Sequence, residues 1–191
     1  MADKANGWAE QLIARIGTGV KKRRTELGLS AQAVADRTAE AGHPIGRGAI
    51  ARMETGSRGT VDVAELVVLA NVLEVSPAAL LWHDAPDTQV ELFPDVHESA
   101  GTAFRWTVGE LPPNTEESAR QYSRLQVLRR LLNARYVLTK FSKQRHPRHG
   151  KNAVEPSPED VAAAYDAIHK AEAEAAAAGW TVHGYKAGTD G

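Results

Sequence analysis

The fold is decided by residues 45–56, which read IGRGAIARMETG. Ile50 and Met53 are three residues apart, so a helix over this stretch places them on one narrow apolar face. Gly46 can serve as its N-cap and Gly56 as a left-handed C-cap, which gives about two and a half turns. The residues that point away from the apolar face are Arg47, Gly48 and Arg52. For this helix alone, the arginines are either solvated or in contact with a partner.

Composition narrows the possible classes of protein. The 191 residues are 42% hydrophobic and 25% charged, which suits one or two small globular domains. Because the chain has no cysteine, it has no disulfide, no thiol catalysis and no cysteine-ligated zinc. There is no apolar run long enough to span a bilayer and no signal-peptide pattern, so we expect a cytoplasmic protein with no membrane partner.

Charge is segregated along the chain, although the formal net charge is only −1. Counting Lys, Arg, Asp and Glu, residues 1–60 carry +4, residues 61–118 carry −10, residues 119–151 carry +10 and residues 152–191 carry −5. The charge of each block is therefore more informative than the net charge of the chain.

Helical spacing of apolar residues predicts four further helices around residues 45–56. They run from about residue 8 to 27, from Ser30 to Gly42, from Thr60 or Asp62 to Leu73, and from Ser76 to Trp82. Gly17 and Gly19 weaken the middle of the first helix, which leaves open a break there and a separate helical arm over residues 1–16. Five short helices joined by tight capped turns predict a compact all-helical domain.

At this point a resemblance becomes specific. The chain resembles the Xre/Cro-like repressor family over about residues 16–82. The residues that carry the resemblance are Arg24, Gly28-Leu29-Ser30, Val34-Ala35, Ile45, Ile50, Arg52-Met53-Glu54, Gly56, Leu66, Leu69-Ala70, Leu73, Val75-Ser76 and Leu80-Leu81. The resemblance implies an all-α, five-helix lambda-repressor-like helix-turn-helix domain.

The resemblance also implies roles for individual residues. The recognition helix, residues 47–55, would lie in the major groove of DNA. Its base-facing positions would be Arg47, Gly48 and Arg52. The DNA backbone would be contacted by Gln32, Thr55, Ser57, Arg58 and Thr60. Arg24 would form a structural ion pair with Glu54, and removal of either partner would leave the other poorly compensated.

Two departures from the family pattern bear on these contacts. Ala31 stands where the family usually has glutamine, and Gly48 has no side chain with which to read a base. Base recognition would therefore depend mainly on the two arginines. The stretch 30–46 is also roughly five residues longer than the usual turn, which predicts an extra turn on the second helix.

The remainder of the chain is predicted as a linker, residues 83–114, followed by a helical region, residues 115–191. The linker would contain one short strand or extended piece and one short helix, with Phe104 and Trp106 packed near Trp82 as a satellite core or, alternatively, exposed as a ligand platform. A long helix from Glu116 to about Ser142 and a final helix opened by the capping box at Ser157 would form an antiparallel pair and are the candidate for dimerisation. Residues 1–82 would form the DNA-binding domain.

Three interpretations of the basic block at 119–151 stay open. Its charges could pair with the acidic segments of the same molecule, or it could bind a protein partner. The third is a second DNA contact. That contact would involve Arg129, Arg130, Arg145, Arg148 and Lys151.

Motifs for catalysis do not appear in the sequence. The seven histidines lack the spacing of a zinc hydrolase, and there is no glycine-rich phosphate loop and no nucleophile elbow. We therefore expect no enzyme, no cofactor and no metal site.

The sequence thus predicts a sequence-specific, double-stranded DNA-binding transcriptional repressor, of the kind that controls a phage or other mobile element. Family members usually bind a palindromic operator as homodimers. A monomer with bipartite DNA binding is the alternative assembly. The alternative function is an antitoxin-like or partner-binding protein that autoregulates through its helix-turn-helix.

Overall fold

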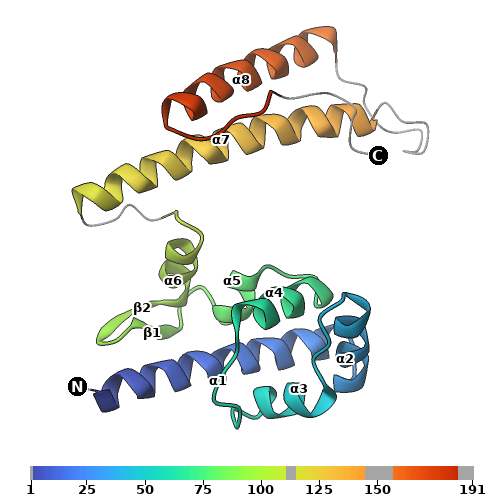
Figure 1. The fold of residues 1–191 in the computed structure, drawn as a ribbon, viewed down its shortest axis with the longest axis vertical. Helices are drawn as coiled ribbons and strands as arrows, with labels where there is room; N and C mark the ends of the chain where they lie inside the picture. Colours follow the sequence, from blue (N-terminus) through green and yellow to red (C-terminus); the bar gives the residue numbers. More distant parts are fainter. Residues whose placement is uncertain (1, 111–114, 145–156, 185–191) are drawn as a thin grey trace. The chain divides into compact units, whose positions relative to one another are not determined.

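The computed structural model describes residues 2–110, 115–144 and 157–184, with side chains over 7–110, 115–139 and 157–184. Within these ranges the fold is predominantly helical, as predicted, with a small two-stranded sheet. The chain divides into two compact units, residues 1–111 and 112–191, which are described separately (Figure 1). The elements are α1 (Ala2–Glu26), α2 (Ala31–Glu40), α3 (Arg47–Glu54), α4 (Val63–Val72), α5 (Pro77–Leu81), β1 (Gln89–Phe93), β2 (Val96–Ser99), α6 (Ala100–Thr107), α7 (Glu116–Gln144) and α8 (Pro158–Ala177).

Helices α1 to α5 surround one hydrophobic core, and each of α2, α4 and α5 begins at a side-chain cap. Ser30 caps α2, Ser76 caps α5, and Asp62 forms a capping box with Glu65 at the start of α4. These caps satisfy backbone N–H groups at the turns, so the short helices can pack closely. The most deeply buried core side chains are Val20, Val34, Ile50, Met53, Leu69, Leu73 and Leu80.

Helix α1 is continuous, so a break at Gly17 and Gly19, with residues 1–16 as a separate arm, is wrong. The two glycines serve tertiary packing instead. A Cβ atom at Gly17 would lie 1.9 Å from the carbonyl oxygen of Met53 on α3, and one at Gly19 would lie 2.3 Å from that of Leu80 on α5. Glycine is therefore required at both positions because two helices cross α1 at backbone contact distance.

Within the first unit, the segment after α5 packs against α1 and the end of α5. Strands β1 and β2 pair antiparallel, with Gln89 opposite Ser99, where one strand or extended piece was predicted. The hairpin and α6 form a second small core with Trp82 from the end of α5. The indole nitrogen of Trp8 on α1 donates a hydrogen bond to the carbonyl oxygen of Glu91 at 3.1 Å. Helix α1 thus supports the helix-turn-helix core with its C-terminal half and the hairpin with its N-terminal half.

The two aromatic residues of α6 differ in their surroundings. Phe104 is partly buried against the second core, as predicted for a satellite core. Trp106 is 51% exposed and meets the ring of Phe93 edge-on, with 5.2 Å between centroids. The prediction of a packed Trp106 is therefore wrong, because this residue lies on the solvent side of α6.

The C-terminal unit is an antiparallel helix pair. The N-terminal half of α7 lies beside the end of α8, since the guanidinium of Arg124 donates to the carbonyl oxygen of Ala178 at 2.9 Å. Toward the other end of the pair, Leu138 packs against Ala164 and Ile168. The pair is closed by Trp180, whose indole nitrogen donates to the carbonyl oxygen of Arg124 at 3.2 Å. None of the described helices is long and apolar enough to cross a membrane.

Candidate nucleic-acid interface

Helix α3 has one fully buried face and one exposed face. Ile50 and Met53 are both 0% exposed, and they hold the helix against the core. The residues on the other face are Arg47, Gly48 and Arg52, all of them exposed. The apolar pair fixes the orientation of the helix, so the two arginines project from a rigid surface.

The guanidinium of Arg52 lies near Gly48. A Cβ atom at Gly48 would lie 3.5 Å from a terminal guanidinium nitrogen of Arg52, an ordinary van der Waals contact, so the arginine side chain turns back along the helix without requiring a glycine there. Helical side chains generally point toward the N-terminus in this way. The guanidinium of Arg52 is therefore drawn toward the helix start, where Arg47 lies.

The exposed face of α3 is fixed by contacts between its other side and α1. Gly17 lets the backbone of Met53 approach, and Arg24 grips Glu54 through two parallel hydrogen bonds of 2.6 and 2.8 Å. Arg24 also donates to the carbonyl oxygen of Leu29 at 2.8 Å. The hydrogen bonds to Glu54 raise the pKa of Arg24, against a smaller opposing effect of burial. The pair implied by the family resemblance is thus present, and it ties the end of the recognition helix to α1.

The turn between α2 and α3 is anchored by a buried hydroxyl. Thr38 is 0% exposed, its hydroxyl donates to the carbonyl oxygen of Ala35 at 2.8 Å, and it accepts the backbone N–H of Ile45 at 3.0 Å. This bond sets the entry into α3 after a turn that is longer than the family's. Helical spacing in the sequence predicts Thr38 on the buried face of α2, but it does not identify the partner of its hydroxyl, which comes from the following loop.

The residues predicted at the DNA backbone lie near α3, but several of their polar groups already have partners. Gln32 is exposed on α2 and donates to the carboxylate of Asp36 at 2.8 Å. Thr55 and Ser57 share a 2.8 Å hydrogen bond between their hydroxyls. Thr60 is exposed in the same loop. These side chains are accessible, and their hydroxyl and amide groups can exchange a weak partner for a phosphate oxygen.

Arg58 has a different environment from that of its neighbours. Its guanidinium lies 2.6 Å from the carboxylate of Glu65, a residue that is only 8% exposed. Glu65 also accepts the backbone N–H of Asp62 as part of the capping box. The positive charge of Arg58 is therefore largely compensated within the domain, and the residue links the loop after α3 to the start of α4.

The second basic block is only partly described. Arg145, Arg148 and Lys151 lie outside the described residues. Arg129 is partly buried on α7, and Arg130 pairs with Glu174 of α8 at 3.0 Å. Neighbouring Arg135 pairs with Glu172 of α8 at 2.7 Å. In the described part of the block, these ion pairs agree with the interpretation in which the basic block pairs with acidic segments of the same molecule.

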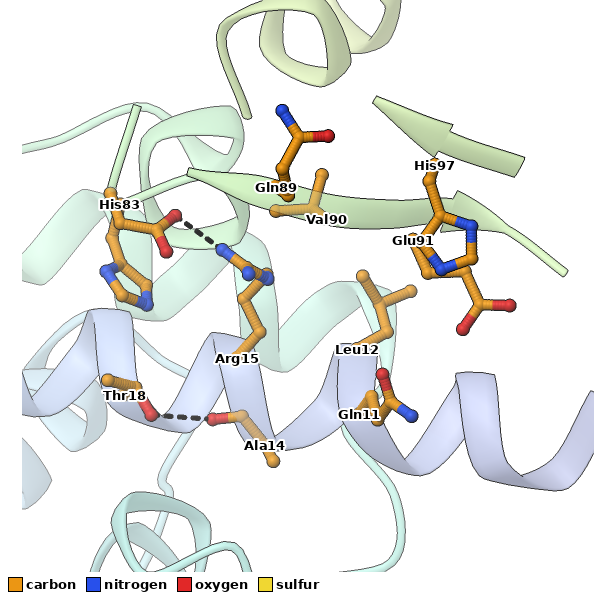
Figure 2. Close-up of a pocket in the computed structure, with 11 residues that line it drawn as sticks. Gln11, Leu12, Ala14, Arg15, Thr18, His83, Gln89, Val90, Glu91 and His97 are labelled. Carbon is orange, nitrogen blue, oxygen red and sulfur yellow. Dashed lines mark hydrogen bonds and ion pairs between the residues drawn. The ribbon is translucent and has the colours of Figure 1, made fainter. Parts of the chain in front are cut away.

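A cavity of about 500 Å³ lies between α1 and the hairpin (Figure 2). Arg15 of α1 forms an ion pair with Asp84 at one side of this cavity, and its guanidinium lies 5.8 Å from the centroid of the Trp82 ring. Burial lowers the pKa of the adjacent His83, an effect that Asp84 opposes. Its Nδ1 atom is buried without a hydrogen-bond partner among the described residues. These groups join α1 to the segment after α5, and among the described residues no three His, Asp or Glu side chains gather as a metal site would need.

Comparison with known proteins agrees with this geometry. A family model described as helix-turn-helix matches residues 20–80, which span the C-terminal part of α1 through α5. No curated protein and no solved structure gave a significant match to the chain. The matched segment includes α3 with its exposed arginines, and Arg24 of α1, which pairs with Glu54. Residues 20–80 are therefore an Xre/Cro-like helix-turn-helix domain, the DNA-binding domain of a regulator.

Proposed function

We propose that this protein is a transcriptional repressor that binds a specific double-stranded operator through the exposed face of α3. The observation that carries the proposal is the orientation of α3, with Ile50 and Met53 fully buried and both arginines facing solvent. A helix fits the major groove, and a guanidinium can donate two hydrogen bonds to the O6 and N7 atoms of guanine. Arg47 and Arg52 are the base-reading residues in this proposal.

Gly48 is exposed between the two arginines and has no side chain with which to read a base. Because the side chain of Arg52 turns back along the helix toward Arg47, the two arginines can act on neighbouring base pairs from one end of the helix. Gln32, Thr55, Ser57 and Thr60 would position the domain on the phosphates. Arg58 would act indirectly by holding the loop that carries the hydroxyls, since it is bound to Glu65.

Occupancy of a promoter is sufficient for repression, so this role requires no activity beyond specific binding. The family resemblance further suggests that the regulated genes belong to a phage or another mobile element. It also suggests a homodimer, which would place two copies of α3 one DNA turn apart on a palindrome.

The test begins with selection of the operator from genomic fragments, followed by anisotropy titrations with the selected duplex. Arg47→Ala and Arg52→Ala should each weaken specific binding by about 1–3 kcal/mol. Arg105→Ala is the matched control, because Arg105 is an exposed arginine of the same unit on α6, near Glu110. Equal affinity of all three variants for the operator would remove α3 from the binding site.

The basic segment that follows α7 in the sequence offers a separate test of the bipartite alternative. If Arg145, Arg148 and Lys151 each contact a phosphate, their neutralisation should reduce the slope of log affinity against log salt by about 0.9 per residue. An unchanged slope would assign all DNA contacts to the helix-turn-helix domain and favour the internal pairing of the basic block.

A further inference from the structure

The cavity between α1 and the hairpin has the size of a small-molecule site (Figure 2). Its volume of about 500 Å³ falls in the range of about 300–1,000 Å³ that is usual for ligand pockets. None of its lining residues belongs to α3, so it is separate from the proposed DNA interface. Polar side chains reach it from α1, from both strands of the hairpin and from the turn after α5. They include Gln11, Arg15, Asp84, Gln89, Glu91 and His97.

The charges in this cavity do not balance. Counting Lys, Arg, Asp and Glu, the lining residues provide one cation, Arg15, and two carboxylates, Asp84 and Glu91, which gives a net charge of −1. Arg15 is bound to Asp84 in an ion pair. Glu91 has no Lys or Arg partner in the described part of the chain, and one of its carboxylate oxygens accepts the backbone N–H of Asp95 at 2.8 Å. The second carboxylate oxygen of Glu91 can therefore bind a cationic ligand.

Three further polar side chains of the cavity form no side-chain hydrogen bond with the rest of the described chain. They are Gln11, Gln89 and His97. His97 stands opposite Glu91 in the register of the hairpin, so their side chains lie on one face of it. An amide and an imidazole each donate and accept hydrogen bonds, as a hydroxyl group does. Leu12 and Val90 add apolar surface against which a carbon skeleton can pack. The lining thus fits a compact ligand with several hydroxyl groups and one positive charge.

We propose that this cavity binds a small hydroxylated organic cation, for example an amino sugar. The ammonium group of the ligand pairs with Glu91, and its hydroxyl groups bond to the two glutamine amides and to His97. The ion pair of Arg15 with Asp84 stays intact and fixes the wall at the opposite end of the cavity in Figure 2. Glu91 selects against an anionic analogue, because a second carboxylate beside it would be repelled.

The same stretch of α1 forms part of the cavity and part of the support of α3. Ala14 and Thr18 line the cavity. Between them, Gly17 lies against the carbonyl oxygen of Met53, which a Cβ atom at Gly17 would approach to 1.9 Å. A ligand that bridges α1 and the hairpin therefore contacts the segment that orients the recognition helix. Occupation of the cavity should change the affinity for operator DNA, a step that rests on the proposed function.

Amide NMR titrations of the full-length protein without DNA test the site. The probes are glucosamine, glucose and glucuronate, which share one ring and differ in charge. Glucosamine should give saturable shifts of backbone amide signals around Gln11 in α1 and around Val90 in β1. It should bind at least about threefold more tightly than glucose, the effect of one partly exposed ion pair, and glucuronate should bind least. Absence of saturable shifts with glucosamine, or equal binding of glucosamine and glucose, would overturn the proposal.

Glu91→Gln tests whether the carboxylate selects the cation. The amide keeps the size of the side chain and can still accept the N–H of Asp95, so the hairpin should remain folded. This variant should lose the preference for glucosamine over glucose. Glu98→Gln is the matched control, because Glu98 is an exposed glutamate of β2 outside the lining. An unchanged preference in Glu91→Gln, or the same loss in Glu98→Gln, would also contradict the proposed site.

Operator titrations with and without saturating glucosamine test the link to α3. Operator affinity should change at least about fivefold, and operator DNA should change the affinity for glucosamine by the same factor, because coupling between two sites is reciprocal. Unchanged affinities or unequal factors would overturn this link. The sugar titrations contain no DNA, so their failure would leave the proposed role of Arg47 and Arg52 untouched. Loss of operator binding in the variants of those arginines would, in turn, leave the cavity site in place.

Discussion

Replacing Gly17 by alanine is the most direct perturbation of the recognition helix from outside its own surface. The added Cβ atom would lie 1.9 Å from the carbonyl oxygen of Met53 and 2.7 Å from its carbonyl carbon, while ordinary contact begins at 3.4 Å. Helices α1 and α3 would therefore have to separate by roughly 1.5 Å. The clash is between backbone and Cβ atoms, so no change of rotamer can relieve it.

The expected magnitude follows from two opposing effects. Overpacking a core costs about 1–3 kcal/mol and sometimes more, whereas alanine in place of glycine inside a helix gains about 1 kcal/mol. We expect a net loss of about 2 kcal/mol for Gly17→Ala. A displacement of roughly 1.5 Å also exceeds what a bidentate hydrogen bond tolerates, so operator affinity should fall at least about tenfold.

Two other glycines of α1 provide the controls. Gly19→Ala would place its Cβ atom 2.3 Å from the carbonyl oxygen of Leu80, so it should destabilise the domain by displacing α5 while leaving α3 in its seat. Gly7→Ala meets nothing within 4 Å and should be neutral or slightly stabilising. Chemical denaturation measures stability and anisotropy at a temperature where every variant is folded measures affinity. The reasoning is refuted if Gly17→Ala is as stable as the natural protein, or if Gly17→Ala and Gly19→Ala lose affinity equally.

Three further predictions concern single contacts of the N-terminal unit. Arg24→Gln should lower the free energy of unfolding by about 3 kcal/mol, because the carboxylate of Glu54, whose side chain is 8% exposed, loses its guanidinium partner. A double-mutant cycle with Glu54→Gln should show strong coupling between the two positions, and additive losses would contradict the pair. Thr107→Val should cost about 1 kcal/mol by removing the acceptor 2.8 Å from the indole N–H of Trp82, and an unchanged urea midpoint would argue against this bond. Burial lowers the pKa of His83, so below pH 6.5 there is a range in which the unfolded chain binds a proton at His83 and the folded chain does not. Burial of the neutral imidazole therefore costs no stability above pH 6.5, and the free energy of unfolding falls as the pH falls below that value. His83→Gln should flatten that decline, and parallel stability profiles would assign it to other groups.

The orientation of α3 could be predicted from the sequence because it depends on local periodicity. Ile50 and Met53 are separated by one helical turn, and a glycine stands at each end of the segment, so helix length and buried face follow from residues 45–56 alone. The same holds for α8, whose start is fixed by the capping box at Ser157. Features that depend on neighbours in sequence were accessible before any tertiary contact was known.

Contacts between distant segments explain where the prediction failed. At Gly17 and Gly19, helix propensity predicts a break because it describes an isolated helix and ignores the carbonyl groups of Met53 and Leu80, which lie against α1. The hairpin was similarly hidden, because the alternation of Val90 and Leu92 indicates a strand but does not identify its partner. Tertiary packing, rather than local preference, decides both cases.

Ion pairing changes how the charge blocks of the sequence should be read. Residues 1–60 carry +4 and residues 119–151 carry +10, which suggests two comparable surfaces for DNA. The structure pairs Arg58 with Glu65 and Arg130 with Glu174. Cations of this kind contribute little to the release of counterions from DNA, because binding a phosphate would require them to leave a carboxylate. The specific contacts of the helix-turn-helix domain should therefore be concentrated in the two arginines of α3, where charge, exposure and a rigid seat coincide.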